Sequence, residues 1–173
     1  MKLIRKLAAI GAISVVLGGS AWQVAQGQQR TTSLFSTDCV RGRGMRSSQQ
    51  DISIGREVFT EIFYMTTSDS LITCRIRPAG SPPRFKTLRL AFGVTDDTRT
   101  RKPIEVNVYL DGNLAASRSL SPGEKSLLLL DVSNVSSVAI EVPNNNPNSI
   151  FADRVSFVQA LLEPISSSPG QRY

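Results

Sequence analysis

The sequence of 173 residues contains no histidine. Histidine is the side chain best suited to proton transfer near neutral pH, so a Ser-His-Asp triad is excluded and acid–base catalysis loses its commonest agent. Zinc sites of the usual kinds are excluded as well, because two cysteines alone cannot fill a tetrahedral shell. The sequence therefore favours a protein that is not an enzyme and predicts no cofactor.

Dense clusters of positive charge are also missing. The formal net charge is +6, and subtracting the three cations of Lys2, Arg5 and Lys6, which lie in a segment that we expect to be removed, leaves about +3. Nucleic-acid-binding domains usually gather lysine and arginine on one stripe, because their affinity comes from neutralising many phosphates together. Here only residues 41–46 and 99–102 form short basic clusters, and their composition is that of loops. We interpret them as solvated charge rather than as a site for nucleic acid or another acidic polymer.

The N-terminus has the three-part pattern of a secretory signal. Residues 1–6 (MKLIRK) are positive, residues 7–18 (LAAIGAISVVLG) are apolar, and a small-x-small site follows at residues 25–27. The apolar run is too short for a comfortable membrane span. We expect residues 1–27 to be a signal peptide cleaved after Gly27, or alternatively after Ala21, and the mature protein to be exported to the periplasm or beyond with no membrane span. The alternative is an uncleaved anchor helix.

Export determines how the two cysteines are interpreted. Disulfides persist outside the cytosol, so Cys39 and Cys74 are predicted to be bonded to each other. Closing a loop of this length restricts the unfolded chain by about 3–4 kcal/mol. If the protein were not exported, two free buried thiols would be the alternative.

Composition divides the mature chain into three parts. Residues 28–50 are polar, contain glycine and are weakly periodic, which predicts an extended arm restrained mainly by Cys39. Residues 51–164 alternate between apolar and polar side chains and form the predicted domain. Residues 165–173 (ISSSPGQRY) have the composition of a flexible tail.

The domain reads as about eight strands without a convincing helix. The clearest strand is 104–110 (IEVNVYL), which alternates with a period of two and ends in Asp111-Gly112, the pair that most readily forms a tight hairpin turn. Two antiparallel sheets packed as a sandwich or jelly roll are the natural way to bury such strands. The other expected strands are 58–65 and 71–77, taken as a hairpin; 85–94; 114–120; 126–132, whose four leucines suggest burial on both sides; 137–142; and 155–162.

The stretch 85–163 resembles the NPCBM family of carbohydrate-binding modules. The resemblance is carried by the order of four segments, namely FKTLRLAFGVTDD, IEVNVYLDGN, SPGEKSLLLLDVSNVSSVAIEV and ADRVSFVQALLE. It implies a galactose-binding-like jelly-roll sandwich, of a kind often attached to glycoside hydrolases, with carbohydrate binding as its function. The chain departs from the family near the final strand, where Phe157 stands in place of a common tryptophan.

Sugar sites combine an exposed aromatic face with planar polar side chains that satisfy the hydroxyls. The single tryptophan, Trp22, lies in the predicted signal peptide, so the mature domain has none. Tyr109 points away from the apolar side of its strand and is the best candidate aromatic residue, with Asn107 beside it on the same face. Alternatively, Tyr109 only covers the outer face of the sheet.

Three acidic residues lie in loops next to strands and are further candidates for ligand binding. Asp96 and Asp97 begin a loop after the strand 85–94, and Asp153 precedes the last strand. Carboxylates at a sandwich rim can hold a structural calcium ion, although loops also use aspartate simply to cap turns. A pair of catalytic carboxylates is a further alternative, but no spacing places these residues across one cleft.

Two functions from different classes follow from these observations. The first is a secreted or periplasmic domain that binds carbohydrate without catalysis. The second is a structural or adaptor protein of the cell envelope that docks on another protein through a sheet face or edge.

Overall fold

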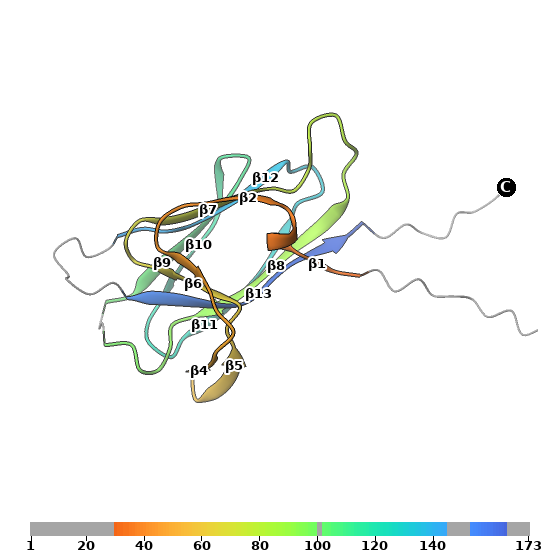
Figure 1. The fold of residues 1–173 in the computed structure, drawn as a ribbon. Helices are drawn as coiled ribbons and strands as arrows, with labels where there is room; N and C mark the ends of the chain where they lie inside the picture. The colour runs from red at the N-terminus through yellow and green to blue at the C-terminus, as the bar shows by residue number, and fades with distance from the viewer. Residues whose placement is uncertain (1–29, 100–101, 145–152, 166–173) are drawn as a thin grey trace, which may run out of the picture.

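The computed structural model describes residues 30–99, 102–144 and 153–165 and shows an antiparallel β-sandwich (Figure 1). This confirms the predicted all-β fold class. The signal peptide expected at 1–27 and residues 166–173 of the expected tail lie outside the described residues. Among the described residues, no helix has the length and apolar character needed to cross a membrane. The elements are β1 (Thr32–Ser33), η1 (Leu34–Ser36), β2 (Asp38–Arg41), β3 (Met45–Ser47), β4 (Asp51–Ile54), β5 (Glu57–Thr60), β6 (Phe63–Thr66), β7 (Ser70–Arg75), β8 (Phe85–Gly93), β9 (Ile104–Leu110), β10 (Asn113–Leu120), β11 (Lys125–Asp131), β12 (Ser137–Val142) and β13 (Arg154–Pro164).

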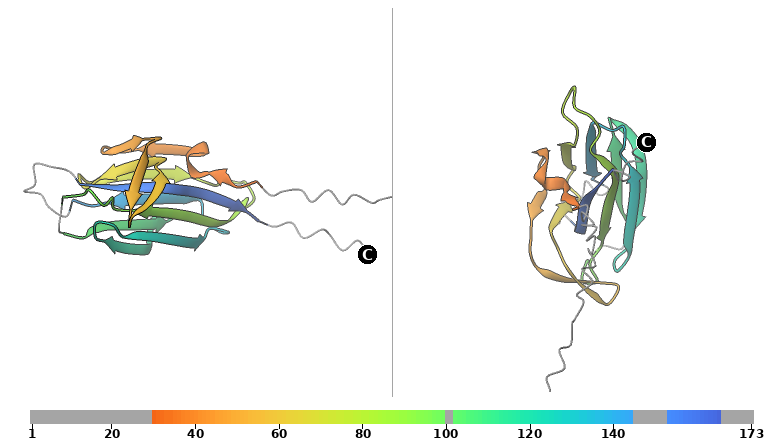
Figure 2. Two further views of the ribbon diagram at one scale, coloured as in Figure 1. Left: turned by 90° about the horizontal axis from the view of Figure 1, so that it is seen from below. Right: turned by 90° about the vertical axis from the view of Figure 1, so that its right-hand side faces the viewer.

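Two sheets form the layers of the sandwich (Figure 2). Sheet A has the order β11-β8-β13-β6-β3, with the short β1 also paired to β13. Sheet B has the order β10-β9-β12-β7-β2. All pairs are antiparallel, so each strand can turn one face to the core and the other outward. The alternating apolar pattern of β8 and β9 follows directly from this arrangement.

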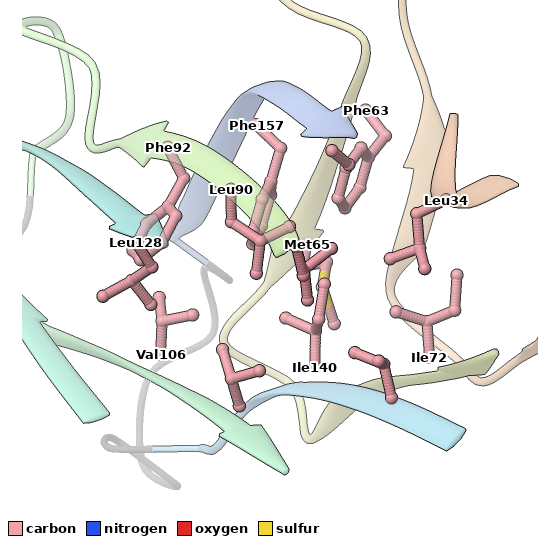
Figure 3. Close-up of a cluster of buried hydrophobic side chains, with 14 of the residues drawn as sticks. Leu34, Phe63, Met65, Ile72, Leu90, Phe92, Val106, Leu128, Ile140 and Phe157 are labelled. Atoms are coloured by element: carbon pink, nitrogen blue, oxygen red, sulfur yellow. The ribbon is translucent and has the colours of Figure 1, made fainter. Parts of the chain in front are cut away.

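The core lies between the two sheets and is built around stacked phenylalanines (Figure 3). Phe63 and Phe157 stack with ring centroids 4.2 Å apart, and the Phe92 centroid lies 5.2 Å from that of Phe157. Val106 and Ile140 of sheet B belong to the same cluster. Phe157, the residue that departs from the family pattern, is therefore a fully buried core residue.

The disulfide between Cys39 and Cys74 is present, as predicted. The two residues lie opposite each other on β2 and β7, so the bond crosses the outer edge of sheet B. It attaches the N-terminal segment to the body of the sandwich.

The segment 28–50 differs from the extended arm expected from its composition. Where it is described, it forms β1, β2 and β3, which pair with β13, β7 and β6 respectively. Leu34 and Met45 are buried in the core. These strands have only two to four residues, and strands this short cannot be recognised by periodicity.

The hairpin predicted from residues 58–65 and 71–77 is wrong. Its first part is divided into β5 and β6, and β6 belongs to sheet A whereas β7 belongs to sheet B. The turn between β6 and β7 therefore carries the chain from one layer to the other. A strand with one buried face shows the same apolar–polar alternation in sheet A as in sheet B. The alternation therefore could not reveal which strand each one pairs with.

The hairpin predicted at Asp111-Gly112 is confirmed. Asn113 pairs with Leu110, and the two turn residues have φ values of 48° and 81°, as this tight turn requires. The Asp111 carboxylate also accepts hydrogen bonds from the backbone N–H groups of Ser136 and Ser137, at 3.0 and 2.8 Å. The turn is thereby attached to the start of β12.

Candidate functional site

The β4–β5 hairpin is a small two-stranded sheet that lies outside the sandwich, over the outer face of sheet A (Figures 1 and 2). Ile52 and Ile54 of the hairpin are buried. Gly93 of β8 allows the close approach, because a Cβ atom there would lie 2.9 Å from the Ile54 side chain. The hairpin therefore forms a wall that stands on sheet A.

A groove of about 730 Å³ lies between this wall and the outer face of sheet A. Its volume falls in the range of sites for small ligands. We call it the hairpin groove. The residues that line it come from four parts of the chain: Ile54, Phe59 and Thr60 from the hairpin; Arg89, Ala91 and Phe92 from β8; Lys125, Ser126 and Leu127 from β11; and Val158 and Gln159 from β13.

Sheet register explains why the polar residues meet on the groove floor. Gln159 of β13 and Leu127 of β11 both lie opposite Ala91 of β8, on its two sides. Arg89 is two residues from Ala91 and points to the same side of the sheet. A bulge at Val158 shifts the register of β13, and Gln159 after it is exposed. The floor thus offers a guanidinium and an amide beside apolar surface.

Both cations at the groove are paired with carboxylates. The Arg89 guanidinium bonds to Glu163 at 2.9 Å, and Lys125 Nζ lies 2.6 Å from Glu57 Oε2. Lys125 Nζ also lies 5.2 Å from the centre of the Phe59 ring. The groove therefore presents donors and acceptors together, with little excess charge of either sign.

Asp96, predicted as a ligand residue, holds the hairpin in place. Its carboxylate accepts hydrogen bonds from the Ser53 hydroxyl at 2.6 Å, the Gly55 N–H at 2.8 Å and the Arg56 N–H at 3.0 Å. The Ser53 bond, followed by the Arg56 N–H, holds the pKa of Asp96 below its ordinary value of 3.8. The Asp96 carboxylate therefore stabilises the turn between β4 and β5.

Replacing Asp96 by asparagine is expected to loosen the hairpin. Because the folded-state pKa is depressed, the stabilisation by the carboxylate is present above pH 3.8 and is lost as the pH falls below that value. Amide hydrogen exchange at Gly55 and Arg56 should therefore become faster at neutral pH in Asp96→Asn. The change that protonation of Asp96 causes in the Gly55 and Arg56 amide resonances below pH 3.8 should be absent from its NMR titration. Asp97→Asn, at the exposed neighbouring residue, is the control. Equal amide exchange in the two variants would contradict the role of Asp96 in holding the hairpin.

Tyr109 and Asn107 lie on the opposite side of the molecule, on the outer face of sheet B. The Tyr109 hydroxyl donates to Glu141 Oε2 at 2.7 Å, and this bond is the main reason why its pKa is raised. Asn107 is 8% exposed, and its Oδ1 atom is buried without a hydrogen-bond partner. This face is separated from the hairpin groove by both layers of the sandwich.

The other acidic candidates lie near one end of sheet A. Asp97 is exposed and lines a pocket of about 300 Å³ together with Asp96 and Arg154. Asp153 accepts a hydrogen bond from the Thr67 N–H through its backbone carbonyl. In the described part of the chain, no three acidic or cysteine side chains gather as a metal site would require. The calcium site remains a prediction from sequence.

Sequence reasoning did not find the groove residues Phe59, Arg89, Lys125 and Gln159. A signal was present for two of them, because Arg89 and Gln159 are polar residues on strands whose other side is apolar. Nothing in the sequence indicated that residues 51–60 would fold back over sheet A. The groove exists only because of that contact.

No known protein family and no curated protein matches this sequence. Solved structures do match its fold. The CBM51 module from Clostridium perfringens GH95, solved with methyl-galactose, is 15% identical with a TM-score of 0.60, and the match covers 77% of this chain and 99% of the module. The CBM51-2 and INT domains of C. perfringens ZmpB, solved with GlcNAc, are 18% identical with a TM-score of 0.58, covering 78% of this chain and 31% of that one.

A third match is the tandem CBM51 modules of the family 98 glycoside hydrolase from Streptococcus pneumoniae. It is 13% identical with a TM-score of 0.64, and it covers 83% of this chain and 50% of that one. The sandwich implied by the NPCBM resemblance is thus confirmed at the level of the fold, over most of the chain rather than only residues 85–163. The described chain has the galactose-binding-like β-sandwich fold of CBM51 carbohydrate-binding modules.

Proposed function

We propose that this protein is a non-catalytic carbohydrate-binding domain that holds a neutral sugar in the hairpin groove. The observation that carries the proposal is the position of the Phe59 ring, which lines the same groove as the Arg89 guanidinium and the Gln159 amide. An aromatic face receives the C–H side of a sugar ring, and planar polar groups satisfy the hydroxyls around it.

The charge balance of the groove supports a neutral ligand over an acidic one. Arg89 and Lys125 already have carboxylate partners in Glu163 and Glu57. An anionic sugar would have to compete with these carboxylates, whereas hydroxyl groups can accept from the cations and donate to the carboxylates at once. Neutral sugars were also bound to two of the modules with the same fold, one with methyl-galactose and one with GlcNAc.

The Phe59→Ala variant tests this proposal. Loss of the ring removes the aromatic surface on which the sugar would rest, and we expect retention on immobilised neutral glycans to weaken about tenfold. Phe59 is part of the small hairpin and not of the sandwich core, so the fold should survive, and circular dichroism should confirm this.

Tyr109→Ala is the matched control, because it removes an aromatic side chain from the outer face of sheet B. Its retention on the same glycans should equal that of the unmodified protein. If Tyr109→Ala loses retention and Phe59→Ala keeps it, the sugar site lies on sheet B, as the sequence predicted, and the groove is not the site. If no glycan is retained and a protein is recovered by crosslinking, the envelope adaptor is the better description.

We also infer that the protein acts outside the cytosol, in the periplasm or extracellular space. The disulfide between Cys39 and Cys74 supports this location, because such bonds persist in oxidising compartments. The N-terminal sequence of the protein recovered after expression tests the inference. A mature chain beginning near Gln28 would support it, and an intact Met1 in the cytosolic fraction would contradict it.

A further inference from the structure

One edge of sheet A is formed by β11, a strand that differs from the strand buried on both sides that its four leucines predicted. The backbone of β11 pairs with β8 along one edge, and within the described residues no strand pairs along its other edge. Leu127 and Leu129 are 53% and 55% exposed, whereas Leu128 is buried in the core. Long apolar edge strands are templates for pairing with another chain, and natural proteins usually protect them.

The backbone of β11 is also available for pairing. Val94 N–H donates to the Glu124 carbonyl and Val132 N–H to the Lys86 carbonyl, so the residues bonded to β8 are the even-numbered ones. The free N–H and C=O groups therefore belong to Lys125, Leu127, Leu129 and Asp131. The register between β11 and β8 is continuous, so no bulge distorts this edge.

The edge strand of sheet B on the same side of the sandwich provides a contrast. β10 has a register shift between Leu114 and Ala116, the kind of irregularity that prevents edge pairing. Arg118 also lies on this strand. On this side of the sandwich, the edge of sheet B is thus protected against pairing with another chain, whereas the edge of sheet A is not.

We propose that two copies of this protein associate through antiparallel pairing of β11 with β11 of the second copy. One register uses all four free residues. In it, Leu127 lies opposite Leu129 of the other copy, and Lys125 lies opposite Asp131. Lys125, whose ammonium group also bonds to Glu57 of its own chain, faces the Asp131 carboxylate of the other copy, while four leucines contact one another on the outer face.

This pairing joins the two copies of sheet A into one continuous sheet. A twofold axis perpendicular to the sheet leaves both hairpin grooves on the same face, because Leu127 lines the groove and also lies at the pairing edge. If the proposed function holds, a dimer would bind a polymeric glycan through two sites at once and gain avidity. The pairing itself does not depend on that function.

Analytical ultracentrifugation of the full chain, without any sugar, tests the proposal. The unmodified protein is expected to reach twice the mass of one chain at micromolar concentrations, and Leu129→Lys is expected to have the mass of a single chain. Leu129 is mainly exposed and does not line the groove, so the fold and the groove should be unaffected. Val40→Lys is the matched control, since Val40 is 76% exposed on β2, at the far edge of sheet B, and it should remain dimeric.

A charge exchange tests the register and guards against misfolding of a variant. Asp131→Lys alone should weaken the dimer, because two cations then face each other at each end of the strand pair. Adding Lys125→Asp to the same chain should restore it, which a misfolded protein could not do. A single-chain mass for the unmodified protein at all concentrations, or a dimer that survives Leu129→Lys, would overturn the proposal.

Discussion

Replacing Phe157 by alanine is expected to lower the free energy of unfolding by about 3–5 kcal/mol, enough to unfold much of a domain of ordinary stability. Phe157 is fully buried, stacks on Phe63 with centroids 4.2 Å apart and contacts Phe92 at 5.2 Å. Its removal leaves a cavity where sheet A meets the core, and the two remaining rings, Phe63 and Phe92, cannot fill it without leaving their own positions. Urea unfolding followed by circular dichroism measures the loss.

Val58→Ala is the control for this prediction. Val58 is 75% exposed on the upper side of the β4–β5 hairpin, so its truncation should change stability by less than about 0.5 kcal/mol. If Phe157→Ala lost no more than Val58→Ala, the aromatic stack would not be the centre of the core. Phe157→Leu should lie between the two, because it keeps part of the buried volume.

Removing the disulfide is the second large effect that we expect. The variant with both Cys39→Ala and Cys74→Ala should lose about 3–4 kcal/mol, because its unfolded chain is no longer restricted by a bond between residues 35 positions apart. The loss should be seen as a lower urea midpoint. Since Cys39 lies on β2, the N-terminal strands should also exchange their amide hydrogens faster than the rest of the sandwich.

Reduction provides an independent check on the same bond. The unmodified protein in dithiothreitol should unfold at nearly the same urea concentration as the double variant, whereas the double variant itself should not respond to the reductant. A midpoint that is unchanged by both treatments would mean that β2 is held by its strand pairing alone.

The fold class could be predicted from sequence because it depends on local signals. The alternation in β8 and β9, and the turn preference of Asp111-Gly112, are properties of adjacent residues. The disulfide could be predicted by a similarly simple argument, since only two cysteines are present. These inferences need no knowledge of which strands become neighbours.

The candidate site could not be predicted, because it depends on contacts between distant residues. Asp96 looked like a ligand residue by composition, yet the hairpin turn at Gly55 and Arg56 uses its carboxylate. Tyr109 was correctly expected on the outer face of its strand, but its hydroxyl is engaged by Glu141 on β12. Loop aspartates and exposed tyrosines look the same in sequence whether they bind a ligand or a neighbouring strand.

The position of β11 illustrates the same limit in an apolar segment. Four consecutive leucines predicted burial on both faces, which is correct for a strand in a sheet that is covered on both sides. In the structure, β11 belongs to one layer of a two-layer sandwich, so only one of its faces lies against the core, and Leu127 and Leu129 on the other face are left at the surface. Hydrophobicity alone does not reveal whether both faces of a strand are covered.

The amino-acid sequence by itself determined that this protein is an antiparallel β-sandwich with one disulfide, because periodicity, turn chemistry and cysteine number act over short distances or leave a single solution. Only the tertiary structure decided which strand lies at the edge, and that residues 51–60 fold over sheet A to form a groove. Those outcomes depend on side chains far apart in the chain, such as Ile54 against Gly93 and Asp96 against Arg56, meeting once the sheets have assembled.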